Sequence, residues 1–360
     1  MTQQKRRPVV VLGSTGAVGQ RFIEGLSNHP WFELTAVAAS DRRAGERFED
    51  SCNWLLSGQP PVAVSSMRLS KTNPAEIELE TARRPIAFSS LPAAVAREVE
   101  PEFARAGYAV FSNASAFRAE DDVPLLIPEV NLQHAPLIRA QRDARGWPGF
   151  IVTNPNCTTT GIALALKPLD DAFGVCKVFA TTLQAISGAG YPGIPSLDVL
   201  DNVIPWIPTE EEKIEQELRL LLGELSQTRV EPSTFEVSAQ ANRVPVLDGH
   251  TICLSVGFKQ PVSPEAAIEV LGDYRGNRAV QGLPSAPSSP LVVRESCDRP
   301  QPRLDRDACN AMAATVGRVR PCPILDLRLV AVVHNTIRGA ALGSILNAEA
   351  FAQSGWLDEA

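Results

Sequence analysis

The first part of the chain alternates short apolar runs with segments of helical spacing. Residues 8–12 read Pro-Val-Val-Val-Leu, a continuous apolar run that is typical of a parallel strand buried on both faces. Similar runs cover residues 32–39, 85–90, 108–111 and 150–153. Because strands that alternate with helices favour parallel pairing, the pattern predicts an α/β fold whose first domain holds a Rossmann-like parallel sheet.

Further along the chain, the strand-like segments change from continuous apolar runs to alternation. Residues 175–186, 234–239, 250–258 and 324–333 read as strands, and in several of them apolar and polar residues take turns. Alternation indicates a sheet with one face covered and one face open, which predicts a second, α+β domain. A last helix is expected over residues 335–349, where small residues on one side permit close approach of another backbone or of a cofactor.

Three polar segments predict a domain boundary, the start of a helix and a loop. Residues 141–148 are rich in charge and end in Gly-Trp-Pro, so we expect a linker and place the domain boundary there. Residues 209–212 read Thr-Glu-Glu-Glu, a capping-box pattern that predicts the start of a helix over residues 213–225. Residues 282–290, with three prolines, are expected to form a loop.

A glycine-rich turn follows the first predicted strand and precedes the first predicted helix. Its glycines are spaced GxxGxxG, a variant of the more familiar GxGxxG. Glycines at such a turn let backbone N–H groups approach a pyrophosphate at the start of the helix, so the context favours dinucleotide binding. The turn residues that we expect to contact the cofactor are Gly13, Ser14, Thr15, Gly16, Ala17 and Val18.

The end of the second predicted strand lies where such folds read the ribose 2′ position. A lone acidic residue there would indicate NAD, whereas Ser40 with Arg42 or Arg43 suits a 2′-phosphate. We therefore expect NADP, although Asp41 leaves NAD possible and the segment could also be an ordinary exposed turn. Loops after the next strands fall on the same ligand-binding edge of the sheet, which includes Ser89 and Ser90 and residues 112–115.

Composition narrows the class of protein. The 360 residues are 44% hydrophobic and 21% charged with a formal net charge of -7, as expected for a globular protein of roughly two domains. No basic or acidic half supports a nucleic-acid or membrane role, and no run approaches the ~20 apolar residues of a membrane span. The seven cysteines are odd in number and lack CxxC spacing, so we expect no metal site, no disulfide framework and a reducing cytoplasmic location.

One cysteine has a distinctive position. Residues 154–156, Asn-Pro-Asn, break the strand at 150–153, and a helical pattern follows, so Cys157 falls where a strand turns into a helix. The free N–H groups and dipole of a helix N-terminus are expected to lower a thiol pKa and to stabilise negative charge. A buried, inert cysteine is the alternative interpretation.

Several motifs occur together in an order that resembles one family, the aspartate-β-semialdehyde dehydrogenases of the archaeal and fungal type. The resemblance runs essentially from end to end. The motifs are Asn154-Pro-Asn-Cys-Thr-Thr159, Gln184-Ala-Ile-Ser-Gly-Ala-Gly-Tyr-Pro-Gly193, Asn242-Arg-Val-Pro-Val-Leu-Asp-Gly-His-Thr251 and His334-Asn-Thr-Ile-Arg-Gly339, together with residues 13–20 and 112–118.

The resemblance implies a reaction and a set of roles. Such enzymes reduce aspartyl phosphate to aspartate semialdehyde with NADPH and release phosphate. Cys157 would be the nucleophile that forms an acyl-thioester, His250 the general acid/base and Gln184 the residue that orients the acyl group. The residues implied to bind substrate are Arg243 for the carboxylate, Arg118 and Lys213 for phosphate, Asn113 nearby, and Glu210 for the amino group. Asn335 and Thr336 are implied near the nicotinamide, and Ser187 and Gly188 are further cofactor-binding residues.

The resemblance also implies an architecture. It comprises an NADP-binding domain over residues 1–150, a catalytic and dimerisation domain with a mixed sheet over 151–334, and a C-terminal helix over 335–360 that returns to the first domain. A homodimer or homotetramer is expected, with a small-molecule substrate and inorganic phosphate as the other partners.

Three other functions remain open at this point. Malonyl-CoA reductases of some archaea resemble the same family and reduce a CoA thioester, and the motif around Cys157 does not separate the two. N-acetyl-glutamyl-phosphate reductase shares the Ser-Gly-Ala-Gly element but fits the Asp248-Gly-His250 motif less well. A non-catalytic NADP or redox sensor would be expected to lack a reacting group.

Overall fold

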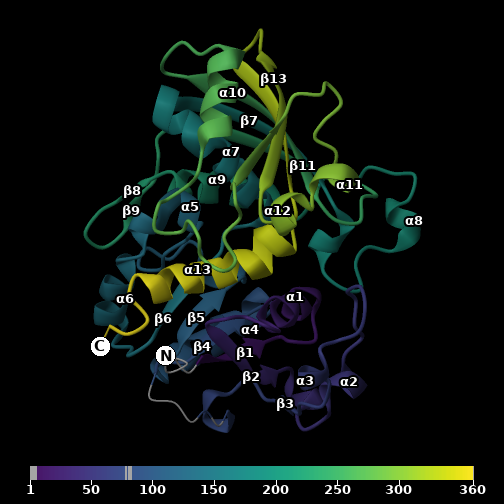
Figure 1. The fold of residues 1–360 in the computed structure, drawn as a ribbon, viewed down its shortest axis with the longest axis vertical. Helices are drawn as coiled ribbons and strands as arrows, with labels where there is room; N and C mark the ends of the chain where they lie inside the picture. Colours follow the sequence, from purple (N-terminus) through teal and green to yellow (C-terminus); the bar gives the residue numbers. More distant parts are fainter. Residues whose placement is uncertain (1–5, 78, 80–82, 360) are drawn as a thin grey trace.

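The structure, a computed structural model, describes residues 6–77, 79 and 83–359. Residues 1–5, 78 and 80–82 of the predicted NADP-binding domain and residue 360 of the predicted C-terminal segment lie outside it. The described chain forms two six-stranded sheets and a two-stranded ribbon. Figure 1 shows one sheet in each half of the molecule, with helix α13 (Leu342–Gln353) running between them. The loops after β4 (Ile86–Ser89) and β5 (Ala109–Ser112) line one cavity together with residues of the second half, so the carboxyl ends of these strands face that half.

The first sheet is parallel throughout and has the strand order β3-β2-β1-β4-β5-β6. Every residue of β4, β5 and β6 is buried, which explains their continuous apolar sequences and confirms the Rossmann-like fold. The strand at 150–153, expected to open the second domain, pairs with β5 as the last strand of this sheet. The strands are β1 (Arg7–Leu12), β2 (Phe32–Ala38), β3 (Leu69–Ser70), β4 (Ile86–Ser89), β5 (Ala109–Ser112) and β6 (Phe150–Thr153).

The linker predicted at residues 141–148 is wrong, because its first five residues complete helix α6. Leu137, Ile138 and Gln141 face inward, and the Gln141 side chain bonds to both the N–H and the C=O of Ile151. The charged residues are the solvated face of this helix, which ends at Gly146 with φ of 64°. The helices of this part are α1 (Ala17–Leu26), α2 (Phe48–Ser51), α3 (Val62–Ser65), α4 (Ala93–Arg105), α5 (Pro128–Asn131) and α6 (Leu137–Arg145).

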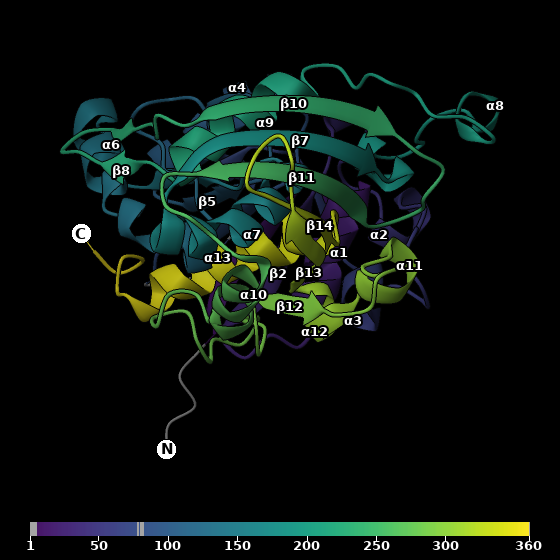
Figure 2. The ribbon, with the colours of Figure 1, turned by 90° about the horizontal axis from the view of Figure 1, so that it is seen from above.

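The second sheet is mixed, with the order β10-β7-β11-β14-β13-β12. Figure 2 shows β10, β7 and β11 side by side, where β10 and β7 run parallel and β11 runs antiparallel to β7. Strands β12 and β13 were not predicted. The strands are β7 (Val175–Gln184), β10 (Glu236–Arg243), β11 (His250–Phe258), β12 (Leu291–Arg294), β13 (Ala314–Pro321) and β14 (Leu327–Val333), and the separate ribbon is β8 (Glu224–Leu225) with β9 (Val230–Glu231).

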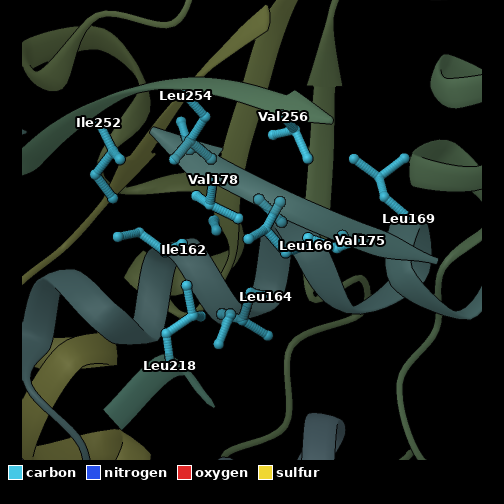
Figure 3. Packing of buried hydrophobic residues seen from close by; sticks show 14 of the residues in the cluster. Ile162, Leu164, Leu166, Leu169, Val175, Val178, Leu218, Ile252, Leu254 and Val256 are labelled. Carbon is cyan, nitrogen blue, oxygen red and sulfur yellow. The ribbon is translucent and has the colours of Figure 1, made fainter. Parts of the chain in front are cut away.

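One face of the second sheet packs on helix α7, which begins at Cys157. Figure 3 shows Ile162 and Leu166 of this helix near Val178 of β7 and Leu254 of β11, within a cluster of buried apolar residues. This core fixes the helix that carries the cysteine. The helices of this part are α7 (Cys157–Phe173), α8 (Ser196–Val199), α9 (Glu210–Leu221), α10 (Pro264–Asp273), α11 (Pro302–Asp305) and α12 (Ala308–Ala311).

The capping box predicted at residues 209–212 is also wrong. Thr209 takes a left-handed conformation, with φ of 61°, and its side chain makes no capping hydrogen bond. Helix α9 begins at Glu210 and ends at Leu221, because residues 224–225 leave it to pair with β9. Two glutamates of the first turn instead bond to other parts of the chain, since Glu210 accepts from the Asn156 amide and Glu211 from the Ala241 N–H.

The C-terminal segment joins the two halves. It begins with a π-helical segment, Ile337–Ala341, and continues as α13, so the predicted helix starts two residues later than expected. Phe351 of α13 packs against Phe111 and Phe150 of the first sheet. The chain thus returns to the first sheet after completing the second.

Candidate active site

Two adjoining cavities form a groove along the carboxyl ends of the first sheet's strands. The first, of about 830 Å³, lies between these strand ends and loops of the second half. The second, of about 840 Å³, extends toward the loops after β1 and β2. The lining residues common to both are Gly16, Ser90, Leu91, Pro92 and Tyr191. We call the first the catalytic cavity, because Cys157 lines it, and the second the β2-side cavity.

Cys157 is the first residue of α7, as the strand-to-helix pattern predicted. The side chain of Asn156 caps this helix by accepting hydrogen bonds from the N–H groups of Thr158 (2.9 Å) and Thr159 (3.2 Å). The Sγ of Cys157 lies 3.1 Å from Nε2 of His250. A thiol that lines the cavity is therefore in direct contact with an imidazole buried behind it.

The expected lowering of the thiol pKa is wrong for this structure. Burial raises the pKa of Cys157 to about 12, and the carboxylate of Glu210 raises it further. Arg118, Arg243 and the Thr158 N–H act in the opposite direction but do not offset the desolvation. The helix N-terminus is present, but the sequence did not show how deeply the sulfur would be buried.

His250 is held as a neutral imidazole. Its Nδ1 accepts a hydrogen bond from the Ala185 N–H (3.0 Å), so the ring proton is assigned to Nε2, which faces the sulfur. Burial lowers the pKa of His250 to about 3, and the nearby Arg243 and His334 lower it too. The pair in the structure is thus a neutral thiol beside an Nε2–H donor.

Two glycines make room for this pair. A Cβ on Gly188 would lie 2.9 Å from Nη1 of Arg243 and 3.1 Å from Cε1 of His250. A Cβ on Gly339, in the π-helical segment, would lie 2.7 Å from the Cβ of Cys157. The loop after β7 and the π-helical segment can therefore close on the reacting groups only with glycine at these positions.

A buried network surrounds the turn before Cys157. Arg118 donates to Oε1 of Glu217 (3.0 Å) and to the Asn113 carbonyl (2.7 Å), while the Asn156 N–H donates to the other oxygen of Glu217. The Asn156 amide in turn donates to both oxygens of Glu210, at 2.8 and 2.9 Å. These bonds tie helix α9 to both the cap of α7 and the loop after β5.

Sequence reasoning missed Glu217. The available signal was helical spacing, because Glu217 shares the buried stripe of α9 with Ile214, Leu218 and Leu221. A carboxylate on an apolar stripe is almost never left unpaired, so it indicates a buried partner.

Arg243 lines the catalytic cavity at the end of β10. Its Nη1 donates to the Ala185 carbonyl (2.7 Å), and its buried Nε has no partner among the described residues. All the predicted substrate-binding residues line the same cavity as Cys157, namely Arg243, Arg118, Asn113, Glu210 and Lys213. The Nζ of Lys213 lies 3.7 Å from Oε1 of Glu210, which precedes Lys213 by one helical turn.

Gln184 is not brought into this group by the structure. Its side chain is buried, donates weakly to Oγ1 of Thr182 (3.3 Å) and does not line the catalytic cavity. The motif gave the residue but not the direction of its side chain. Its orienting role therefore remains a prediction.

The residues predicted to bind the cofactor divide between the two cavities. Those that line the catalytic cavity are Gly16, Ala17, Val18, Ser90, Ser187, Gly188, Asn335 and Thr336. Those that line the β2-side cavity are Gly13, Thr15, Gly16, Ser40, Arg43 and Ser90. Asn335 also links loops, since it donates to Oγ of Ser187 (2.8 Å) and accepts from the Gly249 N–H (2.9 Å).

Three predicted cofactor residues line neither cavity. Ser14 and Ser89 are fully buried, and the Ser14 hydroxyl donates to the Ala38 carbonyl (3.0 Å). Arg42 is exposed, one position away from Arg43 on a short 3₁₀ turn. Neighbouring positions in a sequence motif thus reach different surroundings.

The described residues also bear on metal binding, disulfide bonds and membrane insertion. Within residues 6–77, 79 and 83–359, no group of three or more His, Cys, Asp or Glu residues is placed to hold a metal ion. All seven cysteines are free thiols. No helix in this part of the chain is long and apolar enough to span a bilayer.

Comparison with known proteins places these features in a family. Residues 8–137 match the model of the semialdehyde dehydrogenase NAD-binding domain, and residues 166–338 match that of the semialdehyde dehydrogenase dimerisation domain. The chain is 49% identical to aspartate-semialdehyde dehydrogenase of Archaeoglobus fulgidus, covering 96% of this chain and 97% of that protein. It is 44% identical to that of Schizosaccharomyces pombe, with coverage of 97% and 99%.

Solved structures agree. Aspartate-semialdehyde dehydrogenase from Candida albicans, crystallised with NADP, superposes with a TM-score of 0.88 at 40% identity, covering 97% of this chain and 99% of that one. Aspartate-semialdehyde dehydrogenase II from Vibrio cholerae, complexed with ASA, superposes with a TM-score of 0.75 at 25% identity, covering 97% of this chain and 99% of that one. The fold and the contact between the cysteine and the histidine agree with this similarity, which extends over nearly the full length of both chains. This chain therefore belongs to the aspartate-semialdehyde dehydrogenase family.

Proposed function

We propose that this protein catalyses the NADPH-dependent reductive dephosphorylation of L-aspartyl-4-phosphate to L-aspartate 4-semialdehyde, in the aspartate pathway to lysine, threonine, methionine and isoleucine. The observation that carries the proposal is the 3.1 Å contact between Cys157 Sγ and His250 Nε2, where Cys157 lines the same cavity as Arg118 and Arg243. A nucleophile, a hydrogen-bond donor and two anion-binding groups are what the reaction requires.

Cys157 is the nucleophile of this reaction. Its sulfur forms a bond to the acyl carbon as the bond from that carbon to the phosphate oxygen breaks, and the thiol proton leaves with the phosphate. NADPH, when bound, would supply the hydride that reduces the acyl carbon of the resulting thioester. The aldehyde forms as the bond from this carbon to the Cys157 sulfur breaks, and the sulfur regains a proton.

His250 stabilises the sulfur in both steps. Its Nε2–H points at Sγ, so it donates a hydrogen bond to the thiolate as the sulfur attacks and again as it leaves. A full acid–base cycle needs a second ring proton on Nδ1, where the Ala185 N–H already donates. The geometry therefore supports the donor role, and the general acid/base role implied by the family resemblance stays a prediction.

The charged residues divide the substrate between them. Arg243 is assigned to the carboxylate, because a guanidinium can make bidentate contact with it. Arg118 and Lys213 are assigned to the phosphate, with Asn113 beside Arg118. Glu210 is assigned to the amino group, since its carboxylate lies in the same cavity and is fixed by Asn156.

The groove fits a dinucleotide. Gly13 has φ of 76°, and a Cβ on Gly19 would lie 2.2 Å from the Gly13 carbonyl oxygen, so the turn can pack tightly only with glycines. Helix α1 begins at Ala17, so its first N–H groups are available at the groove. Ser40 and Arg43 line the β2-side cavity, which supports NADP over NAD through contact with the 2′-phosphate.

We also propose the division into three segments at 1–150, 151–334 and 335–360. The separate sheets support it, although the pairing of β6 with β5 favours a first boundary just after residue 153. A homodimer or homotetramer is consistent with the matching dimerisation-domain model. The cytoplasmic location remains a prediction from cysteine usage.

One assay tests the function. NADPH formation from aspartate semialdehyde and phosphate is compared with NADPH consumption on malonyl-CoA, using wild type and Cys157→Ala. Phosphate-dependent turnover in wild type only is the expected result, because alanine removes the nucleophile while sparing the groove. Turnover of malonyl-CoA without use of phosphate would favour the malonyl-CoA reductase alternative, and substantial activity in the alanine variant would exclude Cys157 from the mechanism.

A further inference from the structure

Tyr191 occupies the junction of the two cavities. It lines the catalytic cavity and the β2-side cavity, and it also lines a smaller apolar cavity of about 290 Å³. The other residues common to the two large cavities are those of the glycine turn and of the loop after β4. Tyr191 is the shared lining residue contributed by the second half of the chain, so a ligand that extends through both cavities must pass beside it.

A hydrogen bond connects Tyr191 to the first half of the molecule. The side-chain amide of Asn53 donates to the Tyr191 hydroxyl at 3.2 Å, across 138 residues of sequence. Asn53 also lines the β2-side cavity. The bond therefore crosses from the loop after β7 to the segment that follows α2.

Asn53 is anchored to the glycine turn through Gln20. The buried Gln20 amide donates to the Asn53 carbonyl (2.9 Å) and the Thr15 carbonyl (3.1 Å), and its oxygen accepts from the Leu55 N–H (2.7 Å). A continuous chain of bonds thus runs from the turn proposed to bind pyrophosphate, through Gln20 and Asn53, to Tyr191.

The loop that carries Tyr191 presents its ring rather than burying it. Gly190 and Gly193 have φ of 71° and 86°, so the chain turns sharply on both sides of the tyrosine. Tyr191 is 62% exposed in this structure. A rigid aromatic ring with a fixed hydroxyl and a free face is well suited to cover a bound ligand at little entropic cost.

We propose that Tyr191 and Asn53 are further cofactor-binding residues that form a strap across the middle of the bound dinucleotide. The ring covers the linker between the two halves of the cofactor, and the bond to Asn53 holds the ring in place. The strap slows cofactor release and does not touch the acyl group. This inference rests on the proposed NADP-dependent function.

The test is the dissociation rate of NADP, measured by stopped-flow fluorescence, with the dissociation constant from titration. Tyr191→Ala should release NADP at least tenfold faster than wild type. Tyr191→Phe and Asn53→Ala each remove the same hydrogen bond, which is worth about fivefold. The double variant should match either single variant within twofold, because only one bond is lost.

Two controls make the result specific. Leu197→Ala alters an exposed apolar residue of the same segment that lines none of the three cavities, and it should release NADP at the wild-type rate. In Tyr191→Ala the Michaelis constant for NADP should rise while that for phosphate stays within twofold. The strap is overturned if wild type binds NADP and Tyr191→Ala releases it within twofold of the wild-type rate. Failure of wild type to bind NADP would instead reject the proposed cofactor, and the strap with it.

Discussion

The two ends of the groove differ in how deeply their polar side chains are buried. At the catalytic end, His250, Arg243 and Glu217 are all at most 5% exposed, and their polar atoms bond to groups from distant segments. At the β2-side end, the lining is the backbone of the glycine turn together with exposed side chains such as Ser40 and Arg43. At the catalytic end the polar groups are buried and bonded to protein groups, whereas at the β2-side end they are exposed to solvent.

This difference sets the size of the effect that a substitution can have. A buried polar group that loses its partner costs the full desolvation of what remains, whereas an exposed contact is shared with water and screened by salt. Changes at the catalytic end should therefore alter reactivity and folding by large factors. Changes at the β2-side end should alter cofactor affinity by small ones.

The largest effect is expected in the pH dependence of Cys157 alkylation. Since burial raises the thiol pKa to about 12, the neutral thiol predominates at lower pH, and the reactive thiolate fraction grows tenfold with each pH unit below the pKa. Iodoacetamide labelling of the Cys157 peptide, followed by mass spectrometry, should accelerate about a thousandfold from pH 7 to pH 10 without a plateau.

N-acetylcysteine is the reference for this measurement, because an ordinary thiol has its pKa near 8.5 and levels off above it. A Cys157 rate that levels off below pH 9 would mean that the helix N-terminus outweighs burial, as the sequence alone suggested. The catalytic end would then behave electrostatically like a surface.

The next effect concerns the stability of the buried network. Glu217→Ala leaves Nη1 of Arg118 and the Asn156 N–H without their acceptor. Breaking a buried ion pair from one side costs about 3–5 kcal/mol, and since Arg118 retains some exposure we expect about 2–4 kcal/mol of unfolding free energy. Urea denaturation measures the loss.

Glu215→Ala on the same helix is the matched control. The half-buried Glu215 accepts a hydrogen bond from the Ala239 N–H at 3.0 Å and does not line the catalytic cavity. Its loss should cost about 1 kcal/mol. Equal destabilisation by the two variants would show that the network around Cys157 is no more stabilising than a peripheral contact.

The difference between local pattern and distant partner also explains which features could be predicted from the sequence. The apolar runs identified five of the six parallel strands, because strands in the middle of a covered sheet are apolar along most of their length. The edge strand β3 was not predicted, since two residues are too short to show a pattern. The family resemblance grouped Cys157, His250 and Arg243 in one site, because each residue lies in a motif that the family shares. Glu217 escaped notice because its partners are 99 and 61 residues away, and no local rule connects them.

Local rules failed where tertiary packing decided the outcome. Residues 141–145 are as polar as a linker, but the buried side of that helix packs against β6 of the first sheet. Thr209 has the sequence of a helix cap, yet its backbone takes the left-handed conformation. The direction of the Gln184 side chain, buried against Thr182, likewise depends on packing and not on the motif.

The smallest effect is expected at the β2-side end, where two adjacent arginines can be separated. Arg43 lines the cavity and Arg42 does not, although both are exposed. A charge-assisted hydrogen bond to phosphate is worth about 1.5–3 kcal/mol, and exposure reduces this, so Arg43→Ala should weaken NADP binding about tenfold. Binding of NAD, which lacks the 2′-phosphate, should stay within twofold, and Arg42→Ala should leave both cofactors unchanged. Fluorescence titration at two salt concentrations measures all of these affinities, and the Arg43 effect should shrink at the higher salt concentration because the contact is screened.

Two outcomes would contradict this prediction. A loss of NADP affinity above a hundredfold in Arg43→Ala would mean that Arg43 is enclosed when the cofactor binds, so that the β2-side end is then as buried as the catalytic end. A loss in Arg42→Ala instead would mean that the 3₁₀ turn rotates to exchange the two side chains.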